Sequence, residues 1–196
     1  MGHLLDSHCN DPWVIFRSWY DNTKGLASIS SKDKLLFPFR YLMKKVYPPF
    51  LLHGGDAMSL ATCSPDGNPS SRVVLFKEIW DGGIVFYTNY NSRKSQDLLA
   101  CPQAALCFHW ALPERQVRLE GRVEKVPPEM SDHYWASRPR GSQIGGWASD
   151  QSQPIADRSE LITRVEKFEN QFRGVEVPRP PHWGGFVLRP AVIEFW

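Results

Sequence analysis

The chain of 196 residues is long enough to bury a hydrophobic core without disulfide bonds, and its length is compatible with a single domain. Hydrophobic residues make up 42% of it and charged residues 22%, as is usual for globular proteins. The formal net charge of +2 is too small to indicate a general nucleic-acid binder. The composition therefore favours a globular domain whose basic residues gather in local clusters.

The sequence shows neither a secretory signal nor a membrane span. Residues 1–10 carry one acid and two histidines, where a signal peptide has a basic start and an apolar core. The most apolar segment, Leu35 to Leu52, is interrupted by three basic residues and three prolines. It falls short of the roughly 20 apolar residues that a spanning helix needs. We therefore expect a cytoplasmic protein that does not bind a membrane.

The cysteines and histidines give no sign of a metal site. The four cysteines include no CxxC pair, which favours buried or incidental thiols in a reducing compartment over disulfide bridges or metal ligands. His109, His133 and His182 lack the mutual spacing of a ligand set. We expect no bound metal.

The chain begins with a predicted amphipathic helix. Asp11 is a helix-capping residue, Pro12 suits the first helical position, and Trp13, Phe16 and Trp19 recur at helical spacing. Their aromatic side chains are expected to pack on the core.

Strands with tight turns follow. Turn-rich segments at 64–69 and 81–83 separate apolar runs and predict successive hairpins of an antiparallel sheet. The expected strands are Met58–Cys63, Ser70–Lys77, Ile84–Thr88, Ala104–Trp110 and Gln116–Val126, the last with Val117, Leu119, Gly121 and Val123 on one face.

Helices and a closing strand pair complete the pattern. A helix is expected from Pro128 to Arg138, where Pro139 ends it, and a second from Arg158 to Phe172, whose apolar stripe should lie on the sheet. Residues 186–188 and 192–196 read as a pair of strands. This order of elements predicts a mainly β fold, a small antiparallel barrel with flanking helices. A parallel sheet is not expected, because the sequence shows no βαβ repetition.

Three basic clusters suit anions. Arg72 and Lys77 stand at the two ends of an apolar strand and point to opposite faces, so they could serve two different anions. Arg93 and Lys94 fall at a predicted helix N-terminus, where a bound anion is favourable. Segment 137–152 combines arginine, hydroxyls, amides and glycine, as phosphate sites do. The alternatives are a solvated first helical turn for Arg93 and Lys94, and a polar surface loop for the third cluster.

Taken together, the motifs resemble those of the pyridoxine/pyridoxamine 5'-phosphate oxidase family, in that family's order and over almost the whole chain. They are Asp11-Pro12 through Phe16 and Trp19, Ser71-Arg72-Val73-Val74-Leu75-Phe76-Lys77, Phe86-Tyr87-Thr88-Asn89, Ser92-Arg93-Lys94, Glu114-Arg115-Gln116-Val117, Ser137-Arg138-Pro139, Ser142-Gln143-Ile144-Gly145, Gln151-Ser152, Trp183-Gly184-Gly185 and Glu194-Phe195-Trp196.

The resemblance implies an FMN-binding split barrel, antiparallel and Greek-key-like, that forms a homodimer with flavin at the subunit interface. It assigns FMN binding to Arg72, Val73, Val74, Leu75, Phe76, Lys77, Tyr87, Thr88, Arg93, Lys94, Gln116, Gln151, Ser152 and Trp196. It assigns the substrate phosphate to Lys77, Tyr134, Arg138 and Ser142. From the residues alone, Tyr134 also reads as a core aromatic beside Trp135.

The implied activity is vitamin B6 metabolism: FMN-dependent oxidation of pyridoxine or pyridoxamine 5'-phosphate to pyridoxal 5'-phosphate, with O2 as acceptor and H2O2 released. Another split-barrel flavin oxidase, of phenazine-biosynthesis type, is an alternative that Arg138 with Ser142 disfavours. A non-catalytic binder of FMN or pyridoxal phosphate is a second alternative.

Two departures from the family pattern bear on these expectations. Family members continue past Glu-Phe-Trp into an Arg-Leu-His-Asp-Arg segment that supplies pocket residues, whereas this sequence stops at Trp196, so no catalytic residue is assigned and weak FMN binding with reduced turnover is expected. Within residues 25–55 an insertion is apparent, with Leu35 to Leu52 either a membrane-surface or partner-binding segment or simply inserted sequence.

Overall fold

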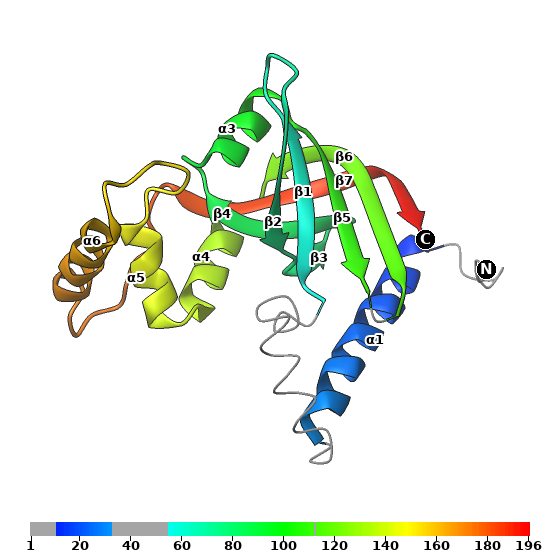
Figure 1. Ribbon diagram of the computed structural model, residues 1–196, viewed down its shortest axis with the longest axis horizontal. Helices are drawn as coiled ribbons and strands as arrows, with labels where there is room; N and C mark the ends of the chain where they lie inside the picture. The colour runs from blue at the N-terminus through cyan, green and yellow to red at the C-terminus, as the bar shows by residue number, and fades with distance from the viewer. Residues whose placement is uncertain (1–10, 33–54, 112) are drawn as a thin grey trace.

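A computed structural model describes residues 11–32, 55–111 and 113–196 (Figure 1). Its helices are α1 (Pro12–Lys32), α3 (Arg93–Ala100), α4 (Pro128–Ser137), α5 (Arg140–Ala148) and α6 (Arg158–Gln171). Its strands are β1 (Ala57–Cys63), β2 (Pro69–Leu75), β3 (Glu78–Trp80), β4 (Gly83–Asn89), β5 (Gln103–Trp110), β6 (Arg115–Lys125) and β7 (Trp183–Phe195). Mainly antiparallel β structure with helices outside it was the predicted class, and it is confirmed.

The strands form one antiparallel sheet in the order β2-β1-β5-β6-β7-β4-β3. Its two edge strands, β2 and β3, are joined by only two residues, Phe76 and Lys77. The backbone N–H of Phe76 donates to Asp56 at 2.8 Å, and that of Lys77 donates to Val85 at 3.0 Å. Because so short a link connects opposite edges, the sheet curls until those edges approach, and Figure 1 shows the resulting half-closed barrel. The hairpin predicted at β1–β2 is confirmed. The turn predicted at 81–83 also exists, but it joins β4 to the short strand β3, which was not predicted, and not to β2.

Helix α1 packs on the core of this barrel, as the aromatic spacing predicted. Asp11 caps it, because its carboxylate accepts a hydrogen bond from the Trp13 N–H at 2.9 Å. The Phe16 side chain is 1% exposed, with its ring 5.1 Å from that of Phe108 and 5.6 Å from that of Phe76. Phe16 thus joins the sheet's core, and Trp13, Trp19 and Tyr20 of the same helix pack against that core.

Strand β6 shows why one face of the sheet is core and the other is surface. Val117, Leu119 and Val123 are at most 4% exposed, whereas the intervening charged side chains face outward. One of these, Arg118, forms ion pairs with Glu120 and with Glu194 of β7. The predicted inward face of this strand is confirmed.

The expected closing pair of strands was wrong, because residues 183–195 form the single strand β7. Its first part pairs with β4 and its later part with β6. Arg189-Pro190 looks like a turn in the sequence, yet Pro190 lies opposite Gly121 at a break in register. Proline lacks the N–H of a regular ladder, and a bulge accommodates it without ending the strand.

Helices α4, α5 and α6 form a layer beside the barrel (Figure 1). Their apolar side chains gather around a second core cluster that includes Trp135, Ile144 and Trp183. The prediction that α6 lies on the sheet was wrong: α6 packs on α5, on the side away from the barrel, and Leu161 remains 36% exposed. An apolar stripe predicts that a helix packs against another element, but it does not identify that element.

The predicted insertion is only partly within the described residues. Helix α1 extends to Lys32, whereas residues 33–54, and with them the Leu35 to Leu52 segment, lie outside the described residues. Among the helices that the structure describes, none is long and apolar enough to cross a membrane.

Candidate functional site

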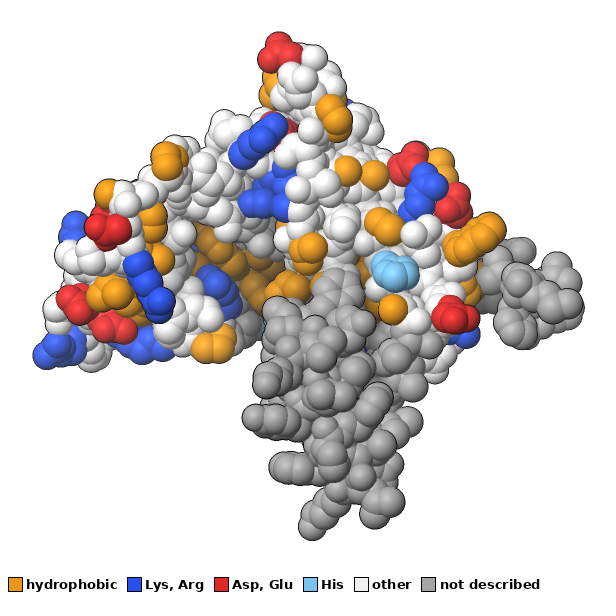
Figure 2. Space-filling view, in the orientation of Figure 1, with side chains coloured by type: hydrophobic (Ala, Val, Ile, Leu, Met, Phe, Trp, Pro, Cys, Tyr) orange, Lys and Arg blue, Asp and Glu red, His pale blue; other side chains and the backbone are white. Residues whose placement is uncertain are grey.

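A cavity of about 670 Å³ lies between the barrel and the helical layer. Figure 2 shows the molecule hollowed there, with apolar side chains at the floor and cations nearby. Residues from β2, β4, α3, α4, α5 and β7 line it. The predicted site residues that line it are Val73, Val74, Leu75, Lys77, Tyr87, Thr88, Lys94, Tyr134, Arg138, Ser142 and Gln151.

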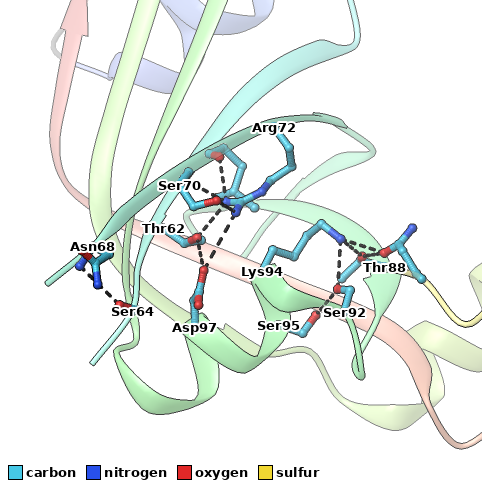
Figure 3. A network of polar contacts seen from close by, with 12 residues as sticks. Thr62, Ser64, Asn68, Ser70, Arg72, Thr88, Ser92, Lys94, Ser95 and Asp97 are labelled. Atoms are coloured by element: carbon cyan, nitrogen blue, oxygen red, sulfur yellow. Dashed lines mark hydrogen bonds and ion pairs between the residues drawn. The ribbon is translucent and has the colours of Figure 1, made fainter. Parts of the chain in front are cut away.

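Lys94 marks one end of the cavity and is only 8% exposed. Its ammonium group donates to Gln151 Oε1 at 2.7 Å, Ser92 Oγ at 2.9 Å and Thr88 Oγ1 at 3.1 Å (Figure 3). Among the residues that the structure describes, no carboxylate forms an ion pair with it. Burial, with a smaller contribution from the charge of Arg72, lowers the pKa of Lys94 to about 8.

Arg72, on strand β2, is a second cation in this region. Its guanidinium donates to Thr62 Oγ1 at 2.7 Å and to Ser70 Oγ at 2.7 Å, and it lies 3.9 Å from the Asp97 carboxylate (Figure 3). Burial lowers the pKa of Arg72, the charge of Asp97 raises it, and the charge of Arg93 lowers it further. Arg72 is thereby held by polar groups of β1 and β2.

Positive charge is therefore in excess at this end of the cavity. The charge of Arg93 acts on Arg72 and the charge of Arg72 acts on Lys94, while Asp97 partly offsets the charge of Arg72. Arg93 and Lys94 begin α3, whose N-terminus adds the positive end of a helix dipole. A bound anion such as a phosphate would relieve this repulsion and compensate the buried ammonium.

The other end of the cavity holds a second group of cations. The rings of Tyr87 and Tyr134 stack 4.1 Å apart, and Lys77 Nζ lies 5.8 Å from the Tyr134 ring. Arg138 follows α4, and its Nη1 is buried without a hydrogen-bond partner in the described structure. Burial lowers the pKa of Arg138. Ser142 lines the same wall one helix further on, so the region assembles a guanidinium, an ammonium and a hydroxyl.

The remaining predicted residues do not line the cavity. Phe76 belongs to the barrel core, Arg93 and Ser152 are exposed, and Arg72 is held by the barrel's own polar groups. Gln116 and Trp196 lie together, paired through backbone hydrogen bonds of 2.7 and 2.8 Å. They stand near α1, where the Trp19 and Phe195 rings are 5.3 Å apart.

Several lining residues were absent from the predicted set. Asn89 and Ser149 line the cavity and are joined by a hydrogen bond of 3.3 Å from the Asn89 amide to the Ser149 carbonyl. Trp183 also lines it, and Gly146 lies in its wall. Asn89 and Trp183 stand within motifs that carried the resemblance, so these motifs could have predicted them. Ser149 and Gly146 belong to no such motif, only to a polar segment.

Known proteins share much of this sequence. The sequence profile of the family described as pyridoxamine 5'-phosphate oxidase matches residues 50–172. A pyridoxine/pyridoxamine 5'-phosphate oxidase of Psychromonas ingrahamii is 50% identical over 85% of this chain and 76% of its own length. One from Cupriavidus metallidurans is 55% identical over 72% of this chain and 66% of its own length. The chain thus spans about two thirds to three quarters of these relatives.

Solved structures share the fold. The protein PhzG of Burkholderia lata, solved with tetrahydrophenazine-1-carboxylic acid, matches with a TM-score of 0.78 and 26% identity, over 100% of this chain and 86% of its own. A pyridoxamine 5'-phosphate oxidase-related, FMN-binding protein of Nostoc punctiforme matches with a TM-score of 0.64 and 15% identity, over 95% of this chain and 85% of its own. The split-barrel fold expected from the sequence is confirmed. By its profile match and by its identity to these oxidases, the chain belongs to the pyridoxamine 5'-phosphate oxidase family.

Proposed function

We propose that this protein is an FMN-dependent oxidase that converts pyridoxine or pyridoxamine 5'-phosphate to pyridoxal 5'-phosphate, with O2 as acceptor and H2O2 as by-product. The observation that carries the proposal is one cavity lined by two cationic side chains, Lys94 and Arg138, to which the described residues offer no ion pair. Two phosphorylated molecules, cofactor and substrate, need such an arrangement. The identity of 50–55% to pyridoxine/pyridoxamine 5'-phosphate oxidases supports it.

The residues at the Lys94 end fit the phosphate of FMN. The buried ammonium lacks an acidic partner within the described structure, and the first turn of α3 faces the same place. Thr88 and Gln151, which hold Lys94 now, are placed to bond phosphate or ribityl oxygens. A cavity of about 670 Å³ is within the size range of cofactor sites.

The residues at the Arg138 end fit the phosphate of the substrate. Arg138 offers two-pronged hydrogen bonding to phosphate oxygens, Lys77 adds a second charge, and Ser142 adds a hydroxyl. Tyr134, stacked on Tyr87, forms an aromatic wall beside them. Fixing the phosphate at this end orients the substrate's pyridine ring along the cavity.

FMN, when bound, supplies the acceptor for the hydride that leaves C4' of the substrate and passes the two electrons to O2. The protein binds both molecules and holds the substrate ring at reacting distance, beside the apolar side chains of β2 that line the cavity, Val73, Val74 and Leu75.

We further propose a cytoplasmic homodimer. Gln116 and Trp196, which the family resemblance assigns to FMN, do not line the cavity of their own subunit, and the Trp196 side chain is 81% exposed. A second copy of the chain related by a two-fold axis would bring them to the cavity from outside. Free thiols at Cys63, Cys101 and Cys107 suit a reducing compartment.

The visible spectrum of the protein tests the proposal. Purified protein is supplemented with FMN, desalted, and treated with pyridoxine 5'-phosphate under anaerobic conditions. Retained flavin that bleaches is the expected result. Retained flavin that stays yellow would favour a binder, or an oxidase of another ring, which the structural similarity to PhzG makes the second candidate. If no flavin is retained, the proposed cofactor site is wrong for this chain.

A further inference from the structure

Arg138 is held by aromatic faces instead of acids. Its guanidinium carbon lies 4.6 Å from the ring centroid of Trp183 and 4.9 Å from that of Trp135. The two indoles meet at 65° with their centroids 4.8 Å apart, so they form a corner in which the guanidinium sits. Among the described residues, no carboxylate forms an ion pair with Arg138.

The choice of aromatic faces has a chemical consequence. A ring face attracts a cation through its quadrupole and uses none of its N–H donors. A carboxylate would both occupy those donors and repel an incoming phosphate. Arg138 Nη1 is buried beside the indoles, and within the described structure the Arg138 side chain makes no hydrogen bond, so its other N–H groups stay available to a ligand.

Both indoles are fixed in place by the fold. Trp135 is 2% exposed and donates from Nε1 to the Val177 carbonyl at 2.8 Å. A Cβ at Gly146 would come within 2.7 Å of the Trp135 ring, so only glycine leaves room for it. Trp183 begins β7 and stacks on Tyr87 at 5.5 Å, and its carbonyl accepts a hydrogen bond of 2.7 Å from Arg179.

The backbone of Arg138 is fixed as well. It caps α4 in an extended conformation (φ −73°, ψ 144°), its N–H donates to the Trp135 carbonyl at 3.1 Å, and Pro139 follows directly. A residue before proline is disfavoured in the helical region, so the sequence itself enforces this conformation.

We propose that Trp135 and Trp183 are positioning residues, which hold the Arg138 guanidinium in advance with its donors free for the substrate phosphate. The inference rests on the proposed function and deepens it, since it explains how the phosphate end of the cavity is organised before the substrate arrives. Neither indole is required to touch the phosphate itself. Its effect passes through Arg138.

A double-mutant cycle tests this with FMN-loaded protein: wild type, Trp183→Leu, Arg138→Ala and the double variant. For Trp183→Leu the expected KM for pyridoxine 5'-phosphate rises roughly tenfold with kcat within about twofold of wild type, as the loss of a desolvated cation–π contact predicts. Because Trp183 acts through Arg138, the double variant should be no worse than Arg138→Ala. Losses that multiply would overturn the inference, and so would an unchanged KM in Trp183→Leu.

Two further variants guard against an effect on folding alone. Trp183→Phe keeps a weaker ring face and should give an intermediate KM, even if the leucine variant proves unstable. Trp147→Leu is the matched control, because Trp147 belongs to the same cluster but packs on Phe168 and Phe172. Its KM should equal that of wild type. If KM rose as much in Trp147→Leu as in Trp183→Leu, the rise would be due to lost packing in the cluster and not to the contact with Arg138. That result would overturn the inference.

Product binding separates this inference from the proposed function. Affinities for pyridoxal 5'-phosphate and pyridoxal are compared by their absorbance changes. Trp183→Leu should weaken only the phosphorylated ligand. If wild type does not oxidise pyridoxine 5'-phosphate but Trp183→Leu still loses affinity only for the phosphorylated ligand, the proposed function fails and the positioning role stands. If wild type binds both ligands equally, the positioning role fails.

Discussion

At the scale of single residues, burial of the Lys94 ammonium group lowers the stability of the fold, whereas its charge favours binding of an anion. It is a buried ammonium group without an acidic partner in the described structure, held by two hydroxyls and an amide. Its pKa falls from the ordinary value of 10.5 to about 8. Between pH 8 and pH 10.5 the folded apo protein therefore binds fewer protons than the unfolded chain, so its free energy of unfolding rises with pH across this window. Below about pH 8 Lys94 is charged in both states, and the full cost of burying its charge lowers the stability.

Lys94→Met is expected to weaken FMN binding by roughly 10- to 100-fold, the effect of losing a charge-assisted contact, while the apo protein melts no lower than wild type and should melt higher. Fluorescence titration with FMN and thermal unfolding measure the two effects. The affinity of wild type should also fall as the pH rises above about 8, where free Lys94 loses its charge, and this dependence should vanish in the variant. A lower melting temperature together with unchanged affinity would assign Lys94 to the fold alone.

Arg138→Ala is expected to raise KM for pyridoxine 5'-phosphate by about 10- to 100-fold, since a bidentate, partly buried phosphate contact is removed. FMN affinity should not change. Arg140→Ala is the matched control, because Arg140 lies two residues away but donates to the carbonyls of Val175 and Phe172. Steady-state kinetics of both variants decide the matter, and equal KM values would sink the assignment.

At the scale of elements, strand β7 ties the site to the barrel. Trp183 lines the cavity at its beginning, and its later residues pair with β6 across a bulge. Pro190 and Gly121 lie opposite each other there. A Cβ at Gly121 would collide with the Arg189 carbonyl oxygen, so the bulge depends on this glycine.

Gly121→Ala should therefore destabilise the protein by about 3 kcal/mol, which lowers Tm by roughly 6–12 °C in a domain of this size. Gly141→Ala in α5 is the control, because a Cβ there meets nothing within 4 Å and alanine favours the helix. It should leave Tm unchanged or raise it slightly. Differential scanning calorimetry would refute the bulge argument if the two variants melted alike.

At the scale of the whole molecule, the curled sheet separates two sets of residues that the family resemblance assigns to one cofactor. Lys94 and Gln151 face the cavity, whereas Gln116 and Trp196 lie near α1. A dimer reconciles the two sets if each site draws on both copies.

Subunit complementation tests this. Lys94→Met and Trp196→Ala should each bind FMN weakly as homodimers. In co-expressed mixtures, half of the dimers formed at random are hybrids with one intact site, so about a quarter of the wild-type flavin content should return. Flavin content no greater than the mean of the two parents would exclude a shared site.

Much of the candidate site could be predicted because short motifs carry local chemistry. The Arg93-Lys94 pair was expected at a helix N-terminus and stands at the start of α3, and Arg138-Pro139 was expected to end a helix and does so. Their roles toward FMN and substrate stay predictions. The sequence missed Ser149 and Gly146, because what brings them to the cavity is the packing of α5 and not any pattern of their own.

The sequence by itself determined the amphipathic start, five of the strands, the inward face of β6 and the placement of basic residues at element ends, since these follow from local periodicity and turn chemistry. Only the tertiary structure decided that β7 continues through Pro190, that α6 packs on α5, and that Trp135 and Trp183 enclose Arg138. Each of those depends on which surfaces meet, and contacts between residues distant in the chain leave no periodic signal along it.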